Sequence, residues 1–397
     1  MKTVFIVIFL IFCRLINAQI IYFQDHFDSL DINNSNQTIN GTNYIDIFKK
    51  SIFIEKTKKE FDDLDKNYLN IIGKYNTVLK SYISKESDNS KQYEIHSEDI
   101  EELDSIINKV NYSNVLIINE EHNREETRAY NLWFIQYLKT KGFTHLAMEA
   151  FHGNNKFDFP NSQLGYYFQD PIQTEIFRLA KELGYKFIAY DTFCNNVFKR
   201  DSLQAYNLFT RLPKDINSKT IVIAGQSHGC DDLPMYPQLM GMILKSVYKL
   251  DPITIDQTRG FLATNKEDIK FKNKDFLNQY IKADNIKKQK GFSLFDYFFI
   301  HPNYNLDLQK PSWYLSNGIK KTYFYKYEKK LKPCLIEIYY KNEFKGINEN
   351  IPTPAEIITQ TNSKQELELH LRPYKNYIIV YKDKNNNILY TEDFKAE

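Results

Sequence analysis

Short apolar runs alternate with amphipathic stretches through the middle of the chain. Each run is five or six residues long, which suits a strand buried on both faces of a sheet. The stretches between the runs carry apolar residues at helical spacing. Strands that alternate with helices pair in parallel, because each helix returns the chain to the starting edge of the sheet. The pattern predicts an α/β domain with a mostly parallel sheet flanked by helices. Its first four strands are Val115–Asn119, Thr144–Glu149, Lys186–Asp191 and Thr220–Gly225.

The segments that precede this domain have a different pattern. Apolar residues recur at helical spacing from Phe61 to Tyr82, with Lys and Asp on the other face, which predicts one long amphipathic helix. Ser97 is followed by two acidic residues and has the character of a helix cap with an acidic first turn. It predicts a helix through about Asn108.

The last part of the chain, from Cys334 onward, alternates apolar and polar residues with a period of two. That period is typical of strands with one buried face, and Pro and Asn residues stand between the segments as turn signals. We predict a small C-terminal antiparallel β unit. Its strands are Leu335–Tyr340, Ile357–Gln360, Leu367–Leu371, Tyr377–Tyr381 and Ile388–Thr391.

The chain begins like an exported protein. A basic second residue is followed by an apolar run from Val4 to Phe12, and Ala18 supplies a small residue at the exit, which is typical of a cleaved signal peptide. The run is too short to span a membrane, and no later segment reaches spanning length. We expect a mature chain that begins at Gln19 and is periplasmic or secreted. The expected organisation is a signal peptide (1–18), a polar leader (19–54), a helical extension (55–96), the α/β domain (97–330) and the small β domain (331–397).

Charge and cysteine content narrow the function classes. The 52 basic and 50 acidic residues give a net charge of +2, which offers no electrostatic argument for nucleic-acid binding. Signal cleavage leaves Cys194, Cys230 and Cys334, and three cysteines do not make a disulfide scaffold. Cys194 and Cys230 both follow predicted strands. Two buried thiols, a disulfide and metal ligation all stay open for this pair.

Polar side chains stand where each of the four predicted strands ends. Glu120, Glu121 and His122 follow the first strand, Glu149 ends the second, Asp191 ends the third and His228 follows the fourth. Parallel strands point the same way, so these groups share one edge of the sheet. Ligands of open α/β sheets bind in the crevice at that edge, which makes the cluster a candidate site.

Each of these residues also has a structural interpretation. A single His after a strand is often a satisfied turn residue, and a strand-terminal Asp is often a helix cap. The joint placement favours function, because half-buried charges are costly unless they pair with each other or bind a ligand. His145 lies in mid-strand and is expected to be structural. His152 is a candidate for the surroundings of the site, and His301, after a short apolar strand, is a candidate to reach the crevice.

These motifs resemble a known superfamily. A strand ending in Glu-x-His with a following Arg, a second strand ending in Glu, and a later Gly-x-x-His are similar to erythromycin esterase-like enzymes, ChaN-like haem-binding lipoproteins and Tiki/TraB proteins. Arg200 and Asp201 resemble the Arg-acid element that precedes Gly-x-x-His in ChaN-like members. The resemblance covers Glu98 to Gln257, and the later segments resemble uncharacterised exported bacterial members. The motif residues are Glu120, His122, Arg128, Glu149, Gly225 and His228.

One position departs from the superfamily pattern. The first motif in most relatives opens with Gly, and here Asn119 stands in that place. Tiki-like members, thought to be metal-dependent proteases, carry Gly-x-x-His in both places. Asn also tolerates the left-handed backbone that Gly supplies, so we expect the turn to persist more readily than the inferred activity.

The resemblance and the residue types together support a hydrolase with a small-molecule or peptide substrate. In one version His122, Glu149 and His228, with Asp191 as a further candidate, hold a divalent metal such as Zn, Mn or Co. The metal lowers the pKa of a bound water. Candidate general bases are Glu120 and Glu121, and Arg128 would steady an anionic intermediate. In a metal-free version, which resembles erythromycin esterases, His122 takes the proton from water directly and Glu149 orients it.

Two alternatives belong to other classes. A ChaN-like protein would use the same edge, or its many Tyr side chains, to capture haem or another iron source without catalysis. A degenerate relative would keep the fold alone. An absorption band on adding haem, lost when His122 is replaced, would identify the haem-binding alternative.

Overall fold

A computed structural model describes most of the chain from Tyr44 to Glu397, within the compact unit Gly41–Glu397. The expected signal peptide, most of the leader, Ser97, His152 and Cys334 lie outside the described residues. The described ranges are 44–58, 62–74, 77–78, 100–111, 113–151, 159–192, 194, 196–215, 217–232, 239–258, 280–282, 294–301, 310–316, 318–326, 335–345, 351–359 and 366–397.

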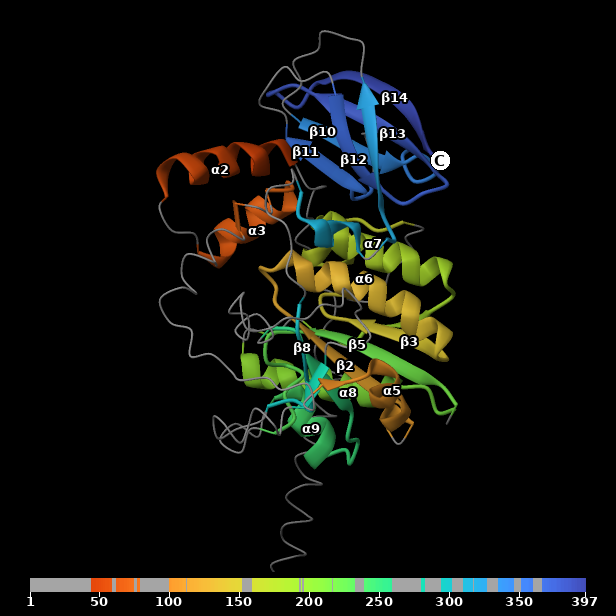
Figure 1. The fold of residues 1–397 in the computed structure, drawn as a ribbon. Coiled ribbons are helices and arrows are strands. Elements are labelled where there is room, and N and C mark those ends of the chain that lie inside the picture. Colours follow the sequence, from red (N-terminus) through yellow and green to blue (C-terminus); the bar gives the residue numbers. More distant parts are fainter. Residues whose placement is uncertain are drawn as a thin grey trace, which may run out of the picture. The chain divides into compact units, whose positions relative to one another are not determined.

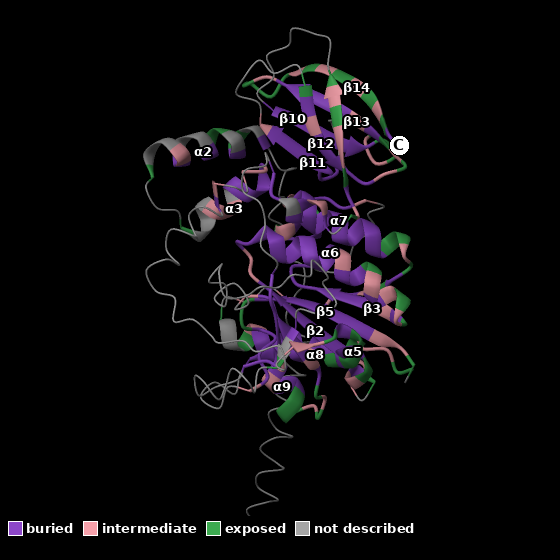
Figure 2. Cartoon of the chain, viewed as in Figure 1, coloured by how far each residue is buried: buried purple, intermediate pink, exposed green. Residues whose placement is uncertain are grey.

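The chain contains the α/β sheet that the sequence predicts (Figure 1). Six strands run parallel in the order β8-β6-β2-β5-β3-β4, and two short strands extend the β8 edge in antiparallel pairing. β2 is buried along its whole length, in keeping with its apolar sequence (Figure 2). The strands are β1 (Ile100–Glu101), β2 (Val115–Glu120), β3 (Phe143–Met148), β4 (Lys186–Ile188), β5 (Lys219–Gly225), β6 (Ile253–Asp256), β7 (Tyr280–Lys282) and β8 (Tyr297–Phe299).

Alternate side chains of the strands fill two different cores. Leu116 and Ile118 of β2 pack in one core with residues of α5, α6 and α7. Val115 and Ile117 pack in the other core with residues of α8 and α9. Helices therefore cover both faces of the sheet. Because the six strands are parallel, their carboxyl ends meet at one edge. The helices are α5 (Leu103–Val110), α6 (Glu125–Thr140), α7 (Pro171–Glu182), α8 (Val197–Arg211) and α9 (Met240–Ser246), with short 3-10 helices η3 (Ser162–Leu164), η4 (Tyr166–Gln169) and η6 (Ser312–Leu315).

The N-terminal helices differ from the prediction. A helix, α2 (Tyr44–Thr57), lies in the expected polar leader, because Tyr44 and Ile47 are buried against the C-terminal strands and tertiary packing stabilises it. The prediction of a single long helix was wrong, since α3 (Asp63–Ile71) ends before Gly73. That residue has φ 78, and the Lys74 N–H donates to the Leu69 carbonyl, as at a glycine-terminated helix end.

The start of the α/β domain also differs. The predicted helix from Ser97 was wrong at its beginning, because Ile100 and Glu101 form a strand that pairs with β7. The helix α5 begins at Leu103 instead, and four of its residues are buried on one face. Ile100 and Glu101 form a strand because they pair with a strand distant in sequence. Local cap signals do not reveal such a partner.

The C-terminal region forms the predicted antiparallel unit. Four strands pair in the order β11-β10-β13-β14, and β12 pairs with β9 in a second, two-stranded sheet. Inward-facing residues of both sheets share one core. β9 was not predicted and lies before the expected boundary. The strands are β9 (Lys321–Lys326), β10 (Leu335–Tyr340), β11 (Glu356–Thr359), β12 (Glu366–Leu371), β13 (Lys375–Lys382) and β14 (Ile388–Ala396).

Candidate functional site

The turn between β2 and α6 carries the first part of the site. Glu120 is the last residue of β2 and is buried, and His122 follows it with a side chain that is 12% exposed. Nδ1 of His122 lies 3.7 Å from a Glu120 oxygen, and Nε2 lies 3.7 Å from a Glu149 oxygen. The imidazole therefore has a buried carboxylate near each of its nitrogens, at distances beyond hydrogen bonding.

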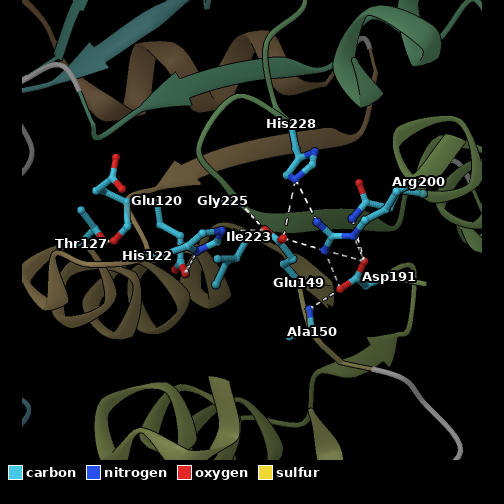
Figure 3. Close-up of polar contacts among 12 residues, drawn as sticks. Glu120, His122, Thr127, Glu149, Ala150, Asp191, Arg200, Ile223, Gly225 and His228 are labelled. Atoms are coloured by element: carbon cyan, nitrogen blue, oxygen red, sulfur yellow. Dashed lines mark hydrogen bonds and ion pairs between the residues drawn. The ribbon is translucent and has the colours of Figure 1, made fainter. Parts of the chain in front are cut away.

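Glu149 lies at the centre of the cluster (Figure 3). One oxygen accepts a 2.6 Å hydrogen bond from the Gly225 backbone N–H, and the other accepts a 2.7 Å bond from Arg200. Nε2 of His228 lies 3.7 Å from the second oxygen. Burial alone would raise the pKa of Glu149, but the charges of His122, His228 and Arg200 outweigh burial and lower it. The carboxylate is thus held ionised between two imidazoles.

His228 belongs to a second pair of side chains. Its Nδ1 lies 2.7 Å from Asp201, which is fully buried in α8 and also accepts a hydrogen bond from the Met240 backbone N–H. Burial would lower the pKa of His228, yet the hydrogen bond with Asp201 and the charge of Glu149 raise it overall. This Asp–His pair fixes the orientation of the ring.

Arg200 joins the parts of the site. Its guanidinium donates to Glu149 and to both oxygens of Asp191, and one of its nitrogens lies 3.2 Å from Nε2 of His228. Asp191 also accepts hydrogen bonds from the Ala150 backbone N–H and from Gln204. Arg200, on α8, therefore pairs with the acids that follow β3 and β4, Glu149 and Asp191.

Gly225 leaves the space in which the site is assembled. A Cβ atom at this position would lie 1.8 Å from Cε1 of His122 and 2.7 Å from an oxygen of Glu149. Both approaches are far below van der Waals contact. Glycine is required here by close approach, and it brings the end of β5 against both side chains.

Arg128 lies behind Glu120 in a buried ionic network. Its guanidinium contacts Glu120 at 3.3 Å, Glu125 at 2.8 Å and Asp170 at 2.7 Å. Burial and the neighbouring charge of Asp170 raise the pKa of Glu125, despite the opposing effect of Arg128. For Glu120, burial would raise the pKa, but Arg128 and His122 lower it. Arg128 thus keeps Glu120 ionised beside His122.

The structure brings together five of the predicted residues and separates others from them. Glu120, His122, Glu149, Asp191 and His228 form the cluster, as the shared strand edge predicts. Arg128 contacts Glu120 of this cluster. Glu121 is half-buried at the turn, where its backbone carbonyl accepts from the Arg124 N–H and the Thr127 hydroxyl.

The other candidate histidines contact hydroxyl and aromatic groups outside the cluster. His145 is half-buried in β3 with Nδ1 2.8 Å from the Thr144 hydroxyl, in keeping with a structural residue. His301 packs edge-on against Tyr130 and Phe299 in the core. Among the described residues, Cys194 and Cys230 are not joined in a disulfide.

The expectation for Asn119 was wrong. This residue is the penultimate residue of β2 and does not have the left-handed backbone of a glycine turn. Its side chain is buried and donates a 3.0 Å hydrogen bond to Asp256 at the end of the neighbouring β6. A side-chain hydrogen bond between strands, and not a turn, explains an Asn at this place.

Several residues of the site were missing from the predicted set. Arg200, Asp201 and Gln204 come from α8, and Tyr167, which stacks on His122, comes from η4. The strand pattern predicts only the side chains at the strand ends, whereas these side chains reach the edge from helices. The Arg-acid element at Arg200 and Asp201 was a signal that pointed to two of them, and nothing in the local sequence marked Tyr167.

The expected metal ligands can be tested by their contacts. Both oxygens of Glu149 and both nitrogens of His228 already have close partners, and Arg200 lies among Glu149, Asp191 and His228. Across the described ranges, no group of three or more His, Cys, Asp or Glu residues is arranged to hold a metal ion. As placed, these residues do not fit a divalent metal, because an arginine cation already lies among them.

The chain was compared with known proteins. It matches no protein-family model and no curated protein. A crystal structure of bacterial protein toxins is similar to it at 13% identity and a TM-score of 0.29, over 50% of this chain and 44% of that one. The match thus spans less than half of the toxin chain, and at this TM-score it carries no argument about function.

Proposed function

We propose that the chain is a hydrolase that activates water with His122 at the carboxyl edge of its parallel sheet. The observation that carries the proposal is the position of His122 between two buried carboxylates, each 3.7 Å from a ring nitrogen. An imidazole that accepts a proton becomes positively charged. Glu120 and Glu149 lie where they stabilise that charge, which is the contribution of the carboxylate in a catalytic triad.

The proposed reaction is attack of water on the carbonyl of an ester or amide. His122 takes a proton from the water as its oxygen bonds to the carbonyl carbon, and it later gives that proton to the leaving group as the bond to that group breaks. Glu149 is a poor base, because both of its oxygens accept hydrogen bonds. Its role is to hold charge and geometry.

Arg200 and His228 supply positive charge on the other side of Glu149. The Arg200 side chain is 24% exposed, the most accessible of the charged groups that contact Glu149. A developing oxyanion beside these groups would be stabilised by a guanidinium and by an imidazole whose pKa is raised. This assigns to Arg200 the role that the sequence assigned to the buried Arg128.

The test is a hydrolysis screen on the chain from Gln19 onward, with 4-nitrophenyl esters, lactones and labelled peptides, in buffer with and without EDTA. We expect EDTA-resistant turnover of at least one class, reduced about 10²- to 10⁴-fold by His122→Ala, which is the usual contribution of a general base. His145→Ala is the matched control, because this histidine lies in β3 outside the cluster. Equal activity of His122→Ala and the unmodified chain would refute the proposal.

Haem capture is the alternative, and the same proteins distinguish it. A binder would give a visible absorption band on adding haem that disappears in His122→Ala and persists in His145→Ala. A hydrolase without such a band supports the proposal.

A further inference from the structure

The ring of His122 is held in place by packing. Tyr167 stacks on it with 4.6 Å between ring centroids and 26° between ring planes. The two neighbouring carboxylates lie 3.7 Å away. Among the described residues, Nδ1 of His122 has no hydrogen-bond partner. A catalytic histidine is usually oriented by a hydrogen bond to one nitrogen. Here an aromatic ring packs against the face of the imidazole instead.

The backbone before Tyr167 is in close contact with the residue that follows Glu149. Gly165 has φ +152, and a Cβ atom there would lie 1.5 Å from the carbonyl oxygen of Ala150. Ala150 directly follows Glu149 and has the left-handed φ of 60. The residue before η4 is therefore in close contact with the backbone of Ala150, next to Glu149. Only glycine permits that approach.

The backbone after Tyr167 is fixed as well. Asp170 caps α7 by accepting from the Ile172 N–H, and it forms a 2.7 Å ion pair with Arg128. The Arg128 guanidinium also lies 4.7 Å from the centroid of the Tyr167 ring, a cation–π distance. Tyr167 is thus anchored to β3 on one side and to α6 and α7 on the other.

We propose that Tyr167 is a positioning residue for His122, because its ring sets the plane of the imidazole that takes the proton from the attacking water. Its effect on turnover rests on the proposed hydrolase function. The stacking itself is a property of the resting protein and can be measured without a substrate. Loss of the ring would leave the imidazole free to rotate, and misplacement of a reacting group by about 1 Å costs about a hundredfold in rate.

Three variants test the proposal. Tyr167→Leu removes the ring, Tyr167→Phe keeps it, and Tyr374→Leu makes the matched change at a tyrosine of the C-terminal β unit, which is 80% exposed. In protein labelled at histidine, the ring-proton signals of His122 are identified by their absence in His122→Ala. A stacked aromatic ring shields these protons, so we expect a downfield shift in Tyr167→Leu and little change in the other two variants.

Turnover provides the second readout. We expect kcat of Tyr167→Leu to fall about tenfold to a hundredfold with a smaller change in KM, and Tyr167→Phe to restore kcat to within about threefold. Unchanged His122 signals in Tyr167→Leu would overturn the proposal, and so would shifted signals with unchanged kcat. If the unmodified chain hydrolyses nothing, the proposed function fails. The His122 signals then decide alone whether Tyr167 orients the ring.

Discussion

Gly225 makes the geometry of the site sensitive to a single added atom. Gly225→Ala would place Cβ within 1.8 Å of the His122 ring and 2.7 Å of Glu149. Because one of these side chains must move, we expect hydrolysis to fall about a hundredfold while the fold persists. Circular dichroism and turnover measure the two effects. The control is Gly142→Ala, which strains a residue with φ +86 but meets nothing within 4 Å. Equal loss in both variants would mean that general destabilisation of the fold, and not crowding of the site, is responsible.

His228 makes stability depend on pH with a definite sign. Its pKa in the folded chain is raised, after burial is outweighed by Asp201 and Glu149. The folded chain therefore binds the proton more tightly than the unfolded chain. The resulting stabilisation is fully present below the ordinary histidine pKa of about 6.5, and it is lost as pH rises through the raised value.

The matching variant is His228→Gln, which cannot titrate. We expect the difference in free energy of unfolding between the unmodified chain and this variant to be larger at pH 5 than at pH 9, as measured by urea denaturation. Each unit of pKa difference corresponds to about 1.4 kcal/mol. A difference that grows toward pH 9 would contradict the assignment. His145→Gln is the control, since burial and nearby lysines lower the pKa of His145 and reverse the sign.

At the scale of elements, α7 and β10 are joined through a buried ionic contact. Arg178 of α7 donates to both oxygens of Glu343, just after β10, and to Glu175, whose other oxygen accepts from the Tyr340 hydroxyl. Arg178→Leu would leave these acids buried without their cation. We expect a loss of about 3 kcal/mol in the free energy of unfolding. Lys341→Ala, which removes an exposed pair with Asp393, should cost under about 1 kcal/mol in the same denaturation assay. Similar losses would contradict the importance of burial.

Elements with strong periodicity could be predicted, and elements that depend on distant partners could not. β2, β3 and β5 each contain a run of apolar residues, and the burial of that run follows directly from the pattern. β1 is two residues long and exists through pairing with β7, nearly two hundred residues away. The helix α2 depends on contacts with β10 and β11. No local pattern contains such information.

The same division applies to the site. The strand-edge argument located His122, Glu149 and His228, because strand direction fixes where their ends meet. Arg200 and Tyr167 reach the same place from α8 and η4. Their approach depends on how helices pack over the edge, and the spacing of residues along the chain does not determine that packing. For this reason the sequence did not reveal that the Arg200 guanidinium lies beside Glu149, Asp191 and His228.

At the scale of the whole molecule, the described chain has no helix long and apolar enough to cross a membrane. The proposed chemistry depends on the balance of charge at one sheet edge. Glu120, Glu149, Asp191 and Asp201 contribute four acids there. Arg200 contacts two of them and Arg128 a third, while His228 pairs with Asp201. Arg200, a cation of the chain itself, thus contacts Glu149, Asp191 and His228, which are three of the four expected metal ligands.

Metal content tests this interpretation for the intact protein. We expect the chain from Gln19 onward, dialysed against EDTA, to keep its hydrolytic activity and to show no visible d–d absorption when Co²⁺ is added. In Arg200→Ala the carboxylates of Glu149 and Asp191 and the Nε2 atom of His228 lose their shared partner. Two carboxylates and an imidazole are suitable ligands for Co²⁺, so this variant should gain the absorption while it loses turnover. Stoichiometric metal in the unmodified chain, with activity that EDTA abolishes and Zn²⁺ or Mn²⁺ restores, would establish the metal-dependent hydrolase instead. Arg200 would then have to move aside when the metal binds.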